Sequence, residues 1–192
     1  MKFTVLFHEY AQQSITSLVS RYGVPKVVIE IGLFEGNTTF NLAQEMIKHC
    51  PEYKHYAIDP YGASADLPND VVNEAEVLFK ANLAEFEHKD NIEFMQMNSH
   101  DALLELYTRG VKADLIYIDG DHRASTVLED LVMGFNLLKD GGIMLCDDCI
   151  AWRQERLQDN PKLAVDSFLN CYWDKVAVEQ LGNGYQIAIR KI

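Results

Sequence analysis

The feature that most constrains the fold of this chain is a hydrophobic period that changes repeatedly between that of a strand and that of a helix. Apolar stripes at helical spacing occupy residues 40–47, 71–86 and 127–138. Short apolar strands separated by helices are typical of right-handed βαβ units, so the pattern predicts an α/β fold whose parallel sheet is covered by helices on both faces. Five short apolar runs predict the strands: Lys26–Ile31, His55–Asp59, Ile92–Met97, Asp114–Ile118 and Gly142–Cys146.

Both ends of the chain add elements to this central pattern. Glu9–Tyr22 is predicted to form a helix before the first strand, and a further helix follows Pro161. Tyr172–Leu181 and Tyr185–Arg190 predict two strands around a turn at Gly182-Asn183-Gly184. The chain is therefore expected to end in an antiparallel hairpin.

Size and charge set limits on the domain organisation and on the partners. The 192 residues are enough for one core, so we expect one domain with an N-terminal helical segment (1–25) and a core (26–192). The net charge is −12 and basic residues occur as isolated pairs such as Arg190-Lys191, which argues against a nucleic-acid partner. No apolar run approaches the ~20 residues that span a bilayer, and Met1–Phe7 is too short for a signal peptide. A cytoplasmic protein without a membrane partner is expected, with its cysteines as thiols.

Candidate functional residues gather where the predicted strands end. In an open α/β sheet, ligands bind beyond the carboxyl ends of the strands. Five carboxylates follow these strands directly, beside Glu30 at the end of the first: Asp59, Asp119, Asp121, Asp147 and Asp148. Like charges repel one another, so their concentration along one rim predicts a binding site.

The turn after the first strand, Gly32–Thr38, indicates the kind of cofactor. A dinucleotide fingerprint needs glycine at its first, third and sixth positions, the middle one so that pyrophosphate can approach the backbone. Those positions hold Gly32, Phe34 and Asn37, so two of the three fail. The turn favours a nucleoside without phosphates, such as S-adenosylmethionine. Asp59, about 27 residues after Gly32, is placed to accept hydrogen bonds from its ribose hydroxyls.

At this point the chain resembles the class I S-adenosylmethionine-dependent methyltransferases, over about residues 26–192. The EIGLFEGNT turn is similar to that of metal-dependent O-methyltransferases such as catechol O-methyltransferase. IDGDH, followed by LLKDGGIMLCDD, is similar to the branch that methylates sugars of macrolide antibiotics. The resemblance implies a Rossmann-like, seven-stranded, mostly parallel sheet with an antiparallel C-terminal hairpin, and S-adenosylmethionine and Mg²⁺ as cofactors.

The resemblance assigns roles around the methionine half of the cofactor. Gly32 and Gly36 would make room for it, and Thr38 at the start of the following helix would bind its carboxylate. Glu30 would orient the amino group, directly or through water.

The nucleoside half falls to residues further along the chain. Asp59 would hold the ribose, and Tyr61 would lie near the adenine. Ser99 and His100 would contact the adenine edge. Asp119 belongs to both the cofactor site and the metal site.

The resemblance also implies the metal ligands and the catalytic base. Asp119, Asp147 and Asp148 would bind the divalent metal, and His122 occupies the position of the general base. An aliphatic hydroxyl is hardly ionised at pH 7. A bound Mg²⁺ lowers its pKa while a nearby imidazole takes the proton. Asp148 stands where the catechol-type enzymes carry Asn, which favours the sugar-type branch.

Two other functions stay open at this level. One is a metal-free methyltransferase, and the other is a catalytically inactive cofactor-binding module or partner subunit. Asp147-Asp148 as a solvated turn and His122 as a surface histidine are the corresponding structural interpretations. The expected acceptor is a small hydroxylated molecule, and its lid is expected from Gly62–Asn69, from Ile150–Asn160 or from a second copy in a homo-oligomer.

Overall fold

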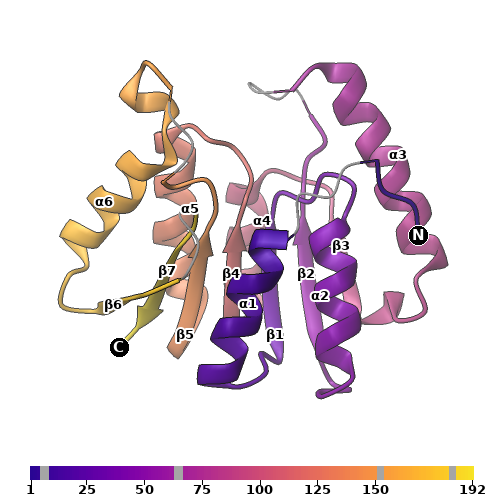
Figure 1. Ribbon diagram of the computed structural model, residues 1–192, viewed down its shortest axis with the longest axis horizontal. Coiled ribbons are helices and arrows are strands. Elements are labelled where there is room, and N and C mark those ends of the chain that lie inside the picture. Colours follow the sequence, from indigo (N-terminus) through magenta and orange to yellow (C-terminus); the bar gives the residue numbers. More distant parts are fainter. Residues whose placement is uncertain (5–8, 63–66, 151–153, 182–184) are drawn as a thin grey trace.

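A seven-stranded sheet of order β3-β2-β1-β4-β5-β7-β6 forms the centre of the described part of the chain (Figure 1). The computed structural model describes residues 1–4, 9–62, 67–150, 154–181 and 185–192. The first five strands are parallel, whereas β7 pairs antiparallel with both β5 and β6. The predicted α/β fold with an antiparallel C-terminal addition is confirmed. The strands are β1 (Val27–Ile31), β2 (Lys54–Ile58), β3 (Ile92–Met95), β4 (Ala113–Ile118), β5 (Leu138–Cys146), β6 (Val176–Glu179) and β7 (Ile187–Lys191).

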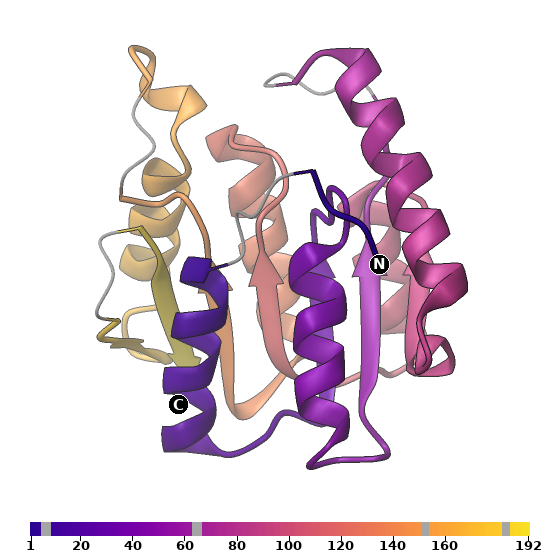
Figure 2. The same ribbon diagram turned by 45° about the vertical axis from the view of Figure 1, so that its right-hand side comes forward.

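In the described ranges, three helices cover each face of the sheet, and Figure 2 shows this arrangement turned by 45° from the view of Figure 1. Helices α1, α2 and α3 pack on one face of the sheet through buried side chains such as Leu18, Phe40 and Phe79. The other face is made with α4, α5 and α6, through Leu103, Leu131 and Phe168. The helices are α1 (Glu9–Tyr22), α2 (Asn37–Ile47), α3 (Asn69–Glu85), α4 (Ser99–Thr108), α5 (Ala124–Leu137) and α6 (Pro161–Cys171), with short 3₁₀ turns η1 (Lys89–Asn91) and η2 (Leu157–Asp159).

The structure differs from the sequence prediction in one helix and in several strand bounds. No helix was predicted between the third and fourth strands, but α4 begins at Ser99, because Ala102, Leu103 and Leu106 form an apolar stripe at helical spacing that is fully buried. The strand β3 ends at Met95 instead of Met97, and β5 begins at Leu138 instead of Gly142. The strand β6 begins at Val176 instead of Tyr172, because α6 extends to Cys171 and the residues after it form a turn. The predicted turn at residues 182–184 lies outside the described residues.

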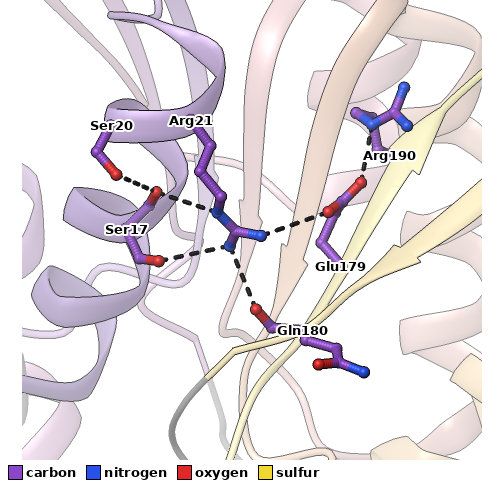
Figure 3. A network of polar contacts seen from close by, with 6 residues as sticks. All are labelled: Ser17, Ser20, Arg21, Glu179, Gln180 and Arg190. Carbon is purple, nitrogen blue, oxygen red and sulfur yellow. Dashed lines mark hydrogen bonds and ion pairs between the residues drawn. The ribbon is translucent and has the colours of Figure 1, made fainter.

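The C-terminal hairpin is tied to α1, far from it in sequence. Figure 3 shows the Arg21 guanidinium donating to one Glu179 oxygen (3.4 Å) and to the Gln180 carbonyl (3.3 Å), while Arg190 donates to the other Glu179 oxygen (2.8 Å). At the other end of α1, the rings of Tyr10 and Tyr185 lie 4.4 Å apart. The helix thus contacts the hairpin at both ends.

The N-terminal residues cross to the turn after β1. The backbone of Lys2 exchanges two hydrogen bonds of 2.8 Å with the Asn82 side chain of α3. The Thr4 amide donates to the buried Glu35 carboxylate (2.6 Å). Residues 1–4 therefore pack beside the turn that was predicted to bind the cofactor.

Within the described ranges, no helix is long and apolar enough to cross a bilayer. The four cysteines are free thiols, as expected.

Candidate active site

The turn after β1 meets the end of β4 where the strand order of the sheet reverses. Ile31 pairs with Ile118, so Gly32 comes to lie against the backbone of Asp119. A Cβ on Gly32, at φ 87°, would lie 2.0 Å from the Asp119 carbonyl oxygen. Glycine is required here because two backbones approach too closely for any side chain. This is also the position at which an open α/β sheet binds ligands.

Gly36 closes the same turn at the start of α2. It has φ 81°, and a Cβ there would lie within 2.6 Å of the Phe40 and Phe79 rings. The amide of Gly36 donates to the Leu33 carbonyl (2.8 Å). The turn is therefore packed onto an aromatic layer beneath it, which fixes its shape.

Asp59, after β2, holds this turn from the side. Its carboxylate accepts the backbone amides of Leu33 (2.9 Å) and Tyr61 (2.8 Å). Burial raises the pKa of Asp59. Tyr61 is buried, and its hydroxyl donates to the Phe34 carbonyl (2.6 Å). Phe34 and Tyr61 both have positive φ, an unfavourable conformation that clusters at functional sites.

Glu30 lies beneath the turn in a buried polar row. Its Oε2 atom is 2.8 Å from Nε2 of His55, and Nδ1 of His55 is 2.8 Å from the Tyr53 hydroxyl. All three side chains are at most 1% exposed. Glu30 is thus buried near the end of β1 and lies within contact distance of β2.

The remaining predicted cofactor residues are distributed over the start of two helices. Thr38 is half-buried in the first turn of α2 and lines a small cavity between α1 and α2. Ser99 is the first residue of α4. Asp130 of α5 is buried, and burial raises its pKa to about 7. His100 is half exposed and pairs with Glu129 of α5 (2.7 Å). His100 is therefore turned toward the surface between α4 and α5.

Asp119, His122 and Asp148 come together at the rim. Each offers one ligand atom, and these atoms lie within 4.8 Å of one another. Nε2 of His122 is 3.2 Å from Oδ2 of Asp148. The residues come from the loops after β4 and β5, whose strands are neighbours in the sheet.

Asp147 lies beside this cluster but its carboxylate is held from the other side. Its Oδ2 accepts Nε2 of Gln186 (2.7 Å) and the Tyr117 hydroxyl, and its Oδ1 accepts the Asp148 amide (2.8 Å). The Tyr117 hydroxyl also lies 2.9 Å from Asp119. Of the three predicted metal ligands, Asp119 and Asp148 therefore face His122, and Asp147 supports the loop behind them.

The charge and the ligand atoms of the cluster suit a divalent cation. Burial, followed by the charges of Asp147 and Asp148, raises the pKa of Asp119 well above its usual range, and burial raises the pKa of Asp147. Three carboxyls thus share this part of the rim with the imidazole of His122. Carboxylate oxygens are the ligands that Mg²⁺ prefers, and imidazole is accepted by Mn²⁺ and other transition metals. The residues present fit such an ion.

Comparison with known families identifies the chain. Residues 29–149 match a family described as a methyltransferase domain. The chain belongs to this family. The matched residues run from β1 to the loop after β5 and include every candidate site residue named above except Gln186. A comparison with curated proteins gave no match.

Solved structures share the fold of this methyltransferase domain. An O-methyltransferase from Bacillus cereus, in complex with SAH, has a TM-score of 0.68 at 16% identity and covers 94% of this chain and 81% of its own. TomG from Streptomyces achromogenes, in complex with SAM, has a TM-score of 0.70 at 16% identity, covering 95% and 80%. A proposed rRNA methylase from Clostridium thermocellum has a TM-score of 0.68 at 17% identity, covering 98% and 100%. At such identities the likeness shows a common class I methyltransferase fold.

Sequence reasoning missed two residues of this rim, Tyr117 and Gln186. Tyr117 carries a signal, because it stands two residues before Asp119 and strand alternation places both on one face of the sheet. Gln186 carries none, since it is 39 residues from Asp147 in the chain. A further cavity of about 400 Å³, between α1 and the starts of β4 and β5, lies at the opposite edge of the sheet and touches no candidate residue.

Proposed function

We propose that this protein transfers a methyl group from S-adenosylmethionine to a hydroxyl of a small molecule, assisted by a divalent cation. The observation that carries the proposal is the cluster of Asp119, His122 and Asp148 within 4.8 Å, directly beside the glycine turn. A cofactor at the turn and an ion at the cluster would be neighbours at the same rim. Bound SAM or SAH in two structural neighbours supports the choice of cofactor.

We propose that the residues around the glycine turn bind the cofactor in the roles that the sequence predicted for them. Asp59 accepts backbone amides, yet each carboxylate oxygen has a second lone pair for a ribose hydroxyl. Gly32 and Gly36 keep the turn free of side chains. Glu30 is buried beneath the turn and would act on the amino group through its charge or through water.

The adenine and the carboxylate of the cofactor are proposed to lie near the first residues of α4 and α2. Thr38 lies in the first turn of α2, where the helix dipole favours an anion. Ser99 begins α4, at the helix start that follows β3 in the chain. Tyr61 and His100 would act through packing at the edge of the site, because Tyr61 is buried and His100 faces the surface.

The chemistry assigned to the cluster follows from its donor set. A bound divalent cation would supply Lewis acidity that lowers the pKa of the acceptor hydroxyl. Asp119 and Asp148 would hold it, and Asp147 orients the loop that carries Asp148. His122 would accept the hydroxyl proton as the methyl group moves from sulfur to oxygen.

A net charge of −12 favours a small acceptor over RNA, although one structural neighbour is a proposed rRNA methylase. Phosphate backbones are bound through clustered Lys and Arg side chains. A neutral or cationic hydroxylated molecule is therefore the acceptor class that we propose.

Calorimetry with S-adenosylmethionine, followed by mass spectrometry of a panel of hydroxylated acceptors with Mg²⁺ or with a chelator, tests this function. We expect cofactor binding, and turnover that stops on chelation. Asp148→Ala, which removes the ligand atom, should weaken Mg²⁺ binding at least about tenfold, whereas the matched control Asp140→Ala, at a side chain that is 92% exposed, should not. Turnover that survives chelation would point to a metal-free enzyme, and cofactor binding without transfer to any acceptor would point to a non-catalytic module.

The role of His122 is separable by a second variant. If His122 is a base, His122→Asn should reduce kcat and leave Mg²⁺ affinity nearly unchanged. If His122 is a metal ligand, the same substitution should lower the affinity itself. Measuring both quantities on one preparation distinguishes the two roles.

A further inference from the structure

The carboxylate of Asp147 is held by donors from three separate segments. Gln186, just before β7, and Tyr117 of β4 both donate to Oδ2, while the Asp148 amide donates to Oδ1. Gln186 is 2% exposed and Tyr117 is 1% exposed. The carboxylate of Asp147, which is half-buried, is therefore held on both oxygens.

This arrangement of Asp147 determines the conformation of the next residue. Asp148 has φ 51°, a left-handed conformation that non-glycine residues adopt rarely and at a cost. The hydrogen bond from its amide to Oδ1 of Asp147 stabilises this conformation. In the same conformation Oδ2 of Asp148 points to His122 at 3.2 Å. Loosening Asp147 would therefore let Asp148 turn away from the cluster.

Gln186 comes from a firmly held element. The Ile150 amide, two residues after Asp148, donates to the carbonyl of Tyr185 (3.2 Å). The hairpin is anchored to α1 through Arg21 and Glu179 (Figure 3). Gln186 also directly precedes Ile187, which pairs with Cys146 at the end of β5. The sheet and α1 therefore hold the segment from which Gln186 reaches Asp147.

An amide suits this position for an electrostatic reason. The Gln186 side chain donates without carrying charge, so it orients the Asp147 carboxylate without neutralising it. A lysine or arginine in its place would compete with a cation for the same negative charge. Hydrogen bonds that orient metal-binding groups from behind change metal affinity by about 10–100-fold in other proteins.

We propose that Gln186 is a positioning residue for the cation loop, residues 147–148. Through Asp147 it holds Asp148 in the conformation that faces Asp119 and His122. This inference rests on the cation of the proposed function. It assigns to the C-terminal hairpin a role in cation affinity that is independent of cofactor binding.

Gln186→Met tests the inference, because Met has nearly the same length and volume but cannot donate. Mn²⁺ affinity is measured by electron paramagnetic resonance and SAH affinity by calorimetry on the same protein preparation. We expect Gln186→Met to weaken Mn²⁺ binding by about 10–100-fold and to leave SAH affinity within about twofold. Gln180→Met, the same change at an exposed side chain beside β6, should alter neither.

A second variant keeps the test decisive if Gln186→Met folds poorly. Gln186→Leu removes the same donor with a smaller side chain and should shift Mn²⁺ affinity in the same direction. Unchanged Mn²⁺ affinity in both variants, or equal losses of Mn²⁺ and SAH affinity, would overturn the positioning role. Wild-type protein that binds SAH but no Mn²⁺ would overturn the metal assistance in the proposed function instead.

Discussion

Gly32→Ala should destabilise the protein more than Gly110→Ala, because two separate costs coincide at Gly32. A residue with a Cβ at φ 87° costs roughly 1–2 kcal/mol. The new Cβ would also lie 2.0 Å from the Asp119 carbonyl oxygen and 2.5 Å from its carbon. These are backbone atoms at the ends of paired strands, so relieving the overlap must shift β1 against β4, which adds about 1–3 kcal/mol. We expect a total loss of roughly 2–5 kcal/mol in the free energy of unfolding.

Urea unfolding followed by circular dichroism measures this loss. With a slope of about 1–3 kcal/mol per molar urea, the midpoint should fall by roughly 2 M. Gly110→Ala is the matched control, because Gly110 has φ 72° and no atom within 4 Å of the place where a Cβ would lie, so it should lose about 1–2 kcal/mol. If Gly32→Ala lost no more than Gly110→Ala, the close approach of the two backbones would not exist in solution.

Three further predictions concern other parts of the fold. Burial raises the pKa of Asp130 to about 7, so between about pH 4 and 7 the folded protein keeps a proton that the unfolded chain, with a pKa near 4, has released. The stability of the wild-type protein should therefore fall as the pH rises from about 4 to 7. Asp130→Asn should flatten that part of a plot of urea midpoint against pH, and an unchanged slope would refute the assignment. Phe79→Ala removes a fully buried ring that packs against Gly36 and should lower the free energy of unfolding by about 3–5 kcal/mol, and it should also weaken SAH binding in calorimetry. A decrease in the free energy of unfolding below about 1 kcal/mol would show that the ring is not packed as described. Arg21→Ala should cost no more than about 1 kcal/mol by the same unfolding assay, since the side chains of Arg21 and Glu179 are 35% and 13% exposed, and a larger loss would make the α1 anchor more important than its geometry indicates.

The order of elements was predictable because it depends on local patterns. The periods of two and 3.6 residues placed the five parallel strands, and Glu9–Tyr22 was predicted with the bounds that the structure shows. Strand ends shifted by a few residues, as at β6, where the end of α6 decides how much chain remains for the strand. Such boundaries depend on packing of the preceding element, which the local pattern does not contain.

The location of the candidate site was likewise predictable, but not the roles within it. Parallel strands bring their carboxyl ends to one rim, so carboxylates that follow these strands must lie near one another. Which of them face inward depends on side-chain partners. Asp147 turns to Tyr117 and Gln186, while Asp148 turns to His122.

By itself, the sequence determined the five parallel strands, most of the helices and the glycine turn, since each of these follows from neighbours within a few residues. The tertiary structure alone decided the contacts between distant segments. Glu30 meets His55 across β1 and β2, Thr4 meets Glu35, and Gln186 meets Asp147 over a separation of 39 residues. These pairs depend on the register of strands and on the packing of helices. Their strength comes from exclusion of water at sites that form when the whole sheet is assembled.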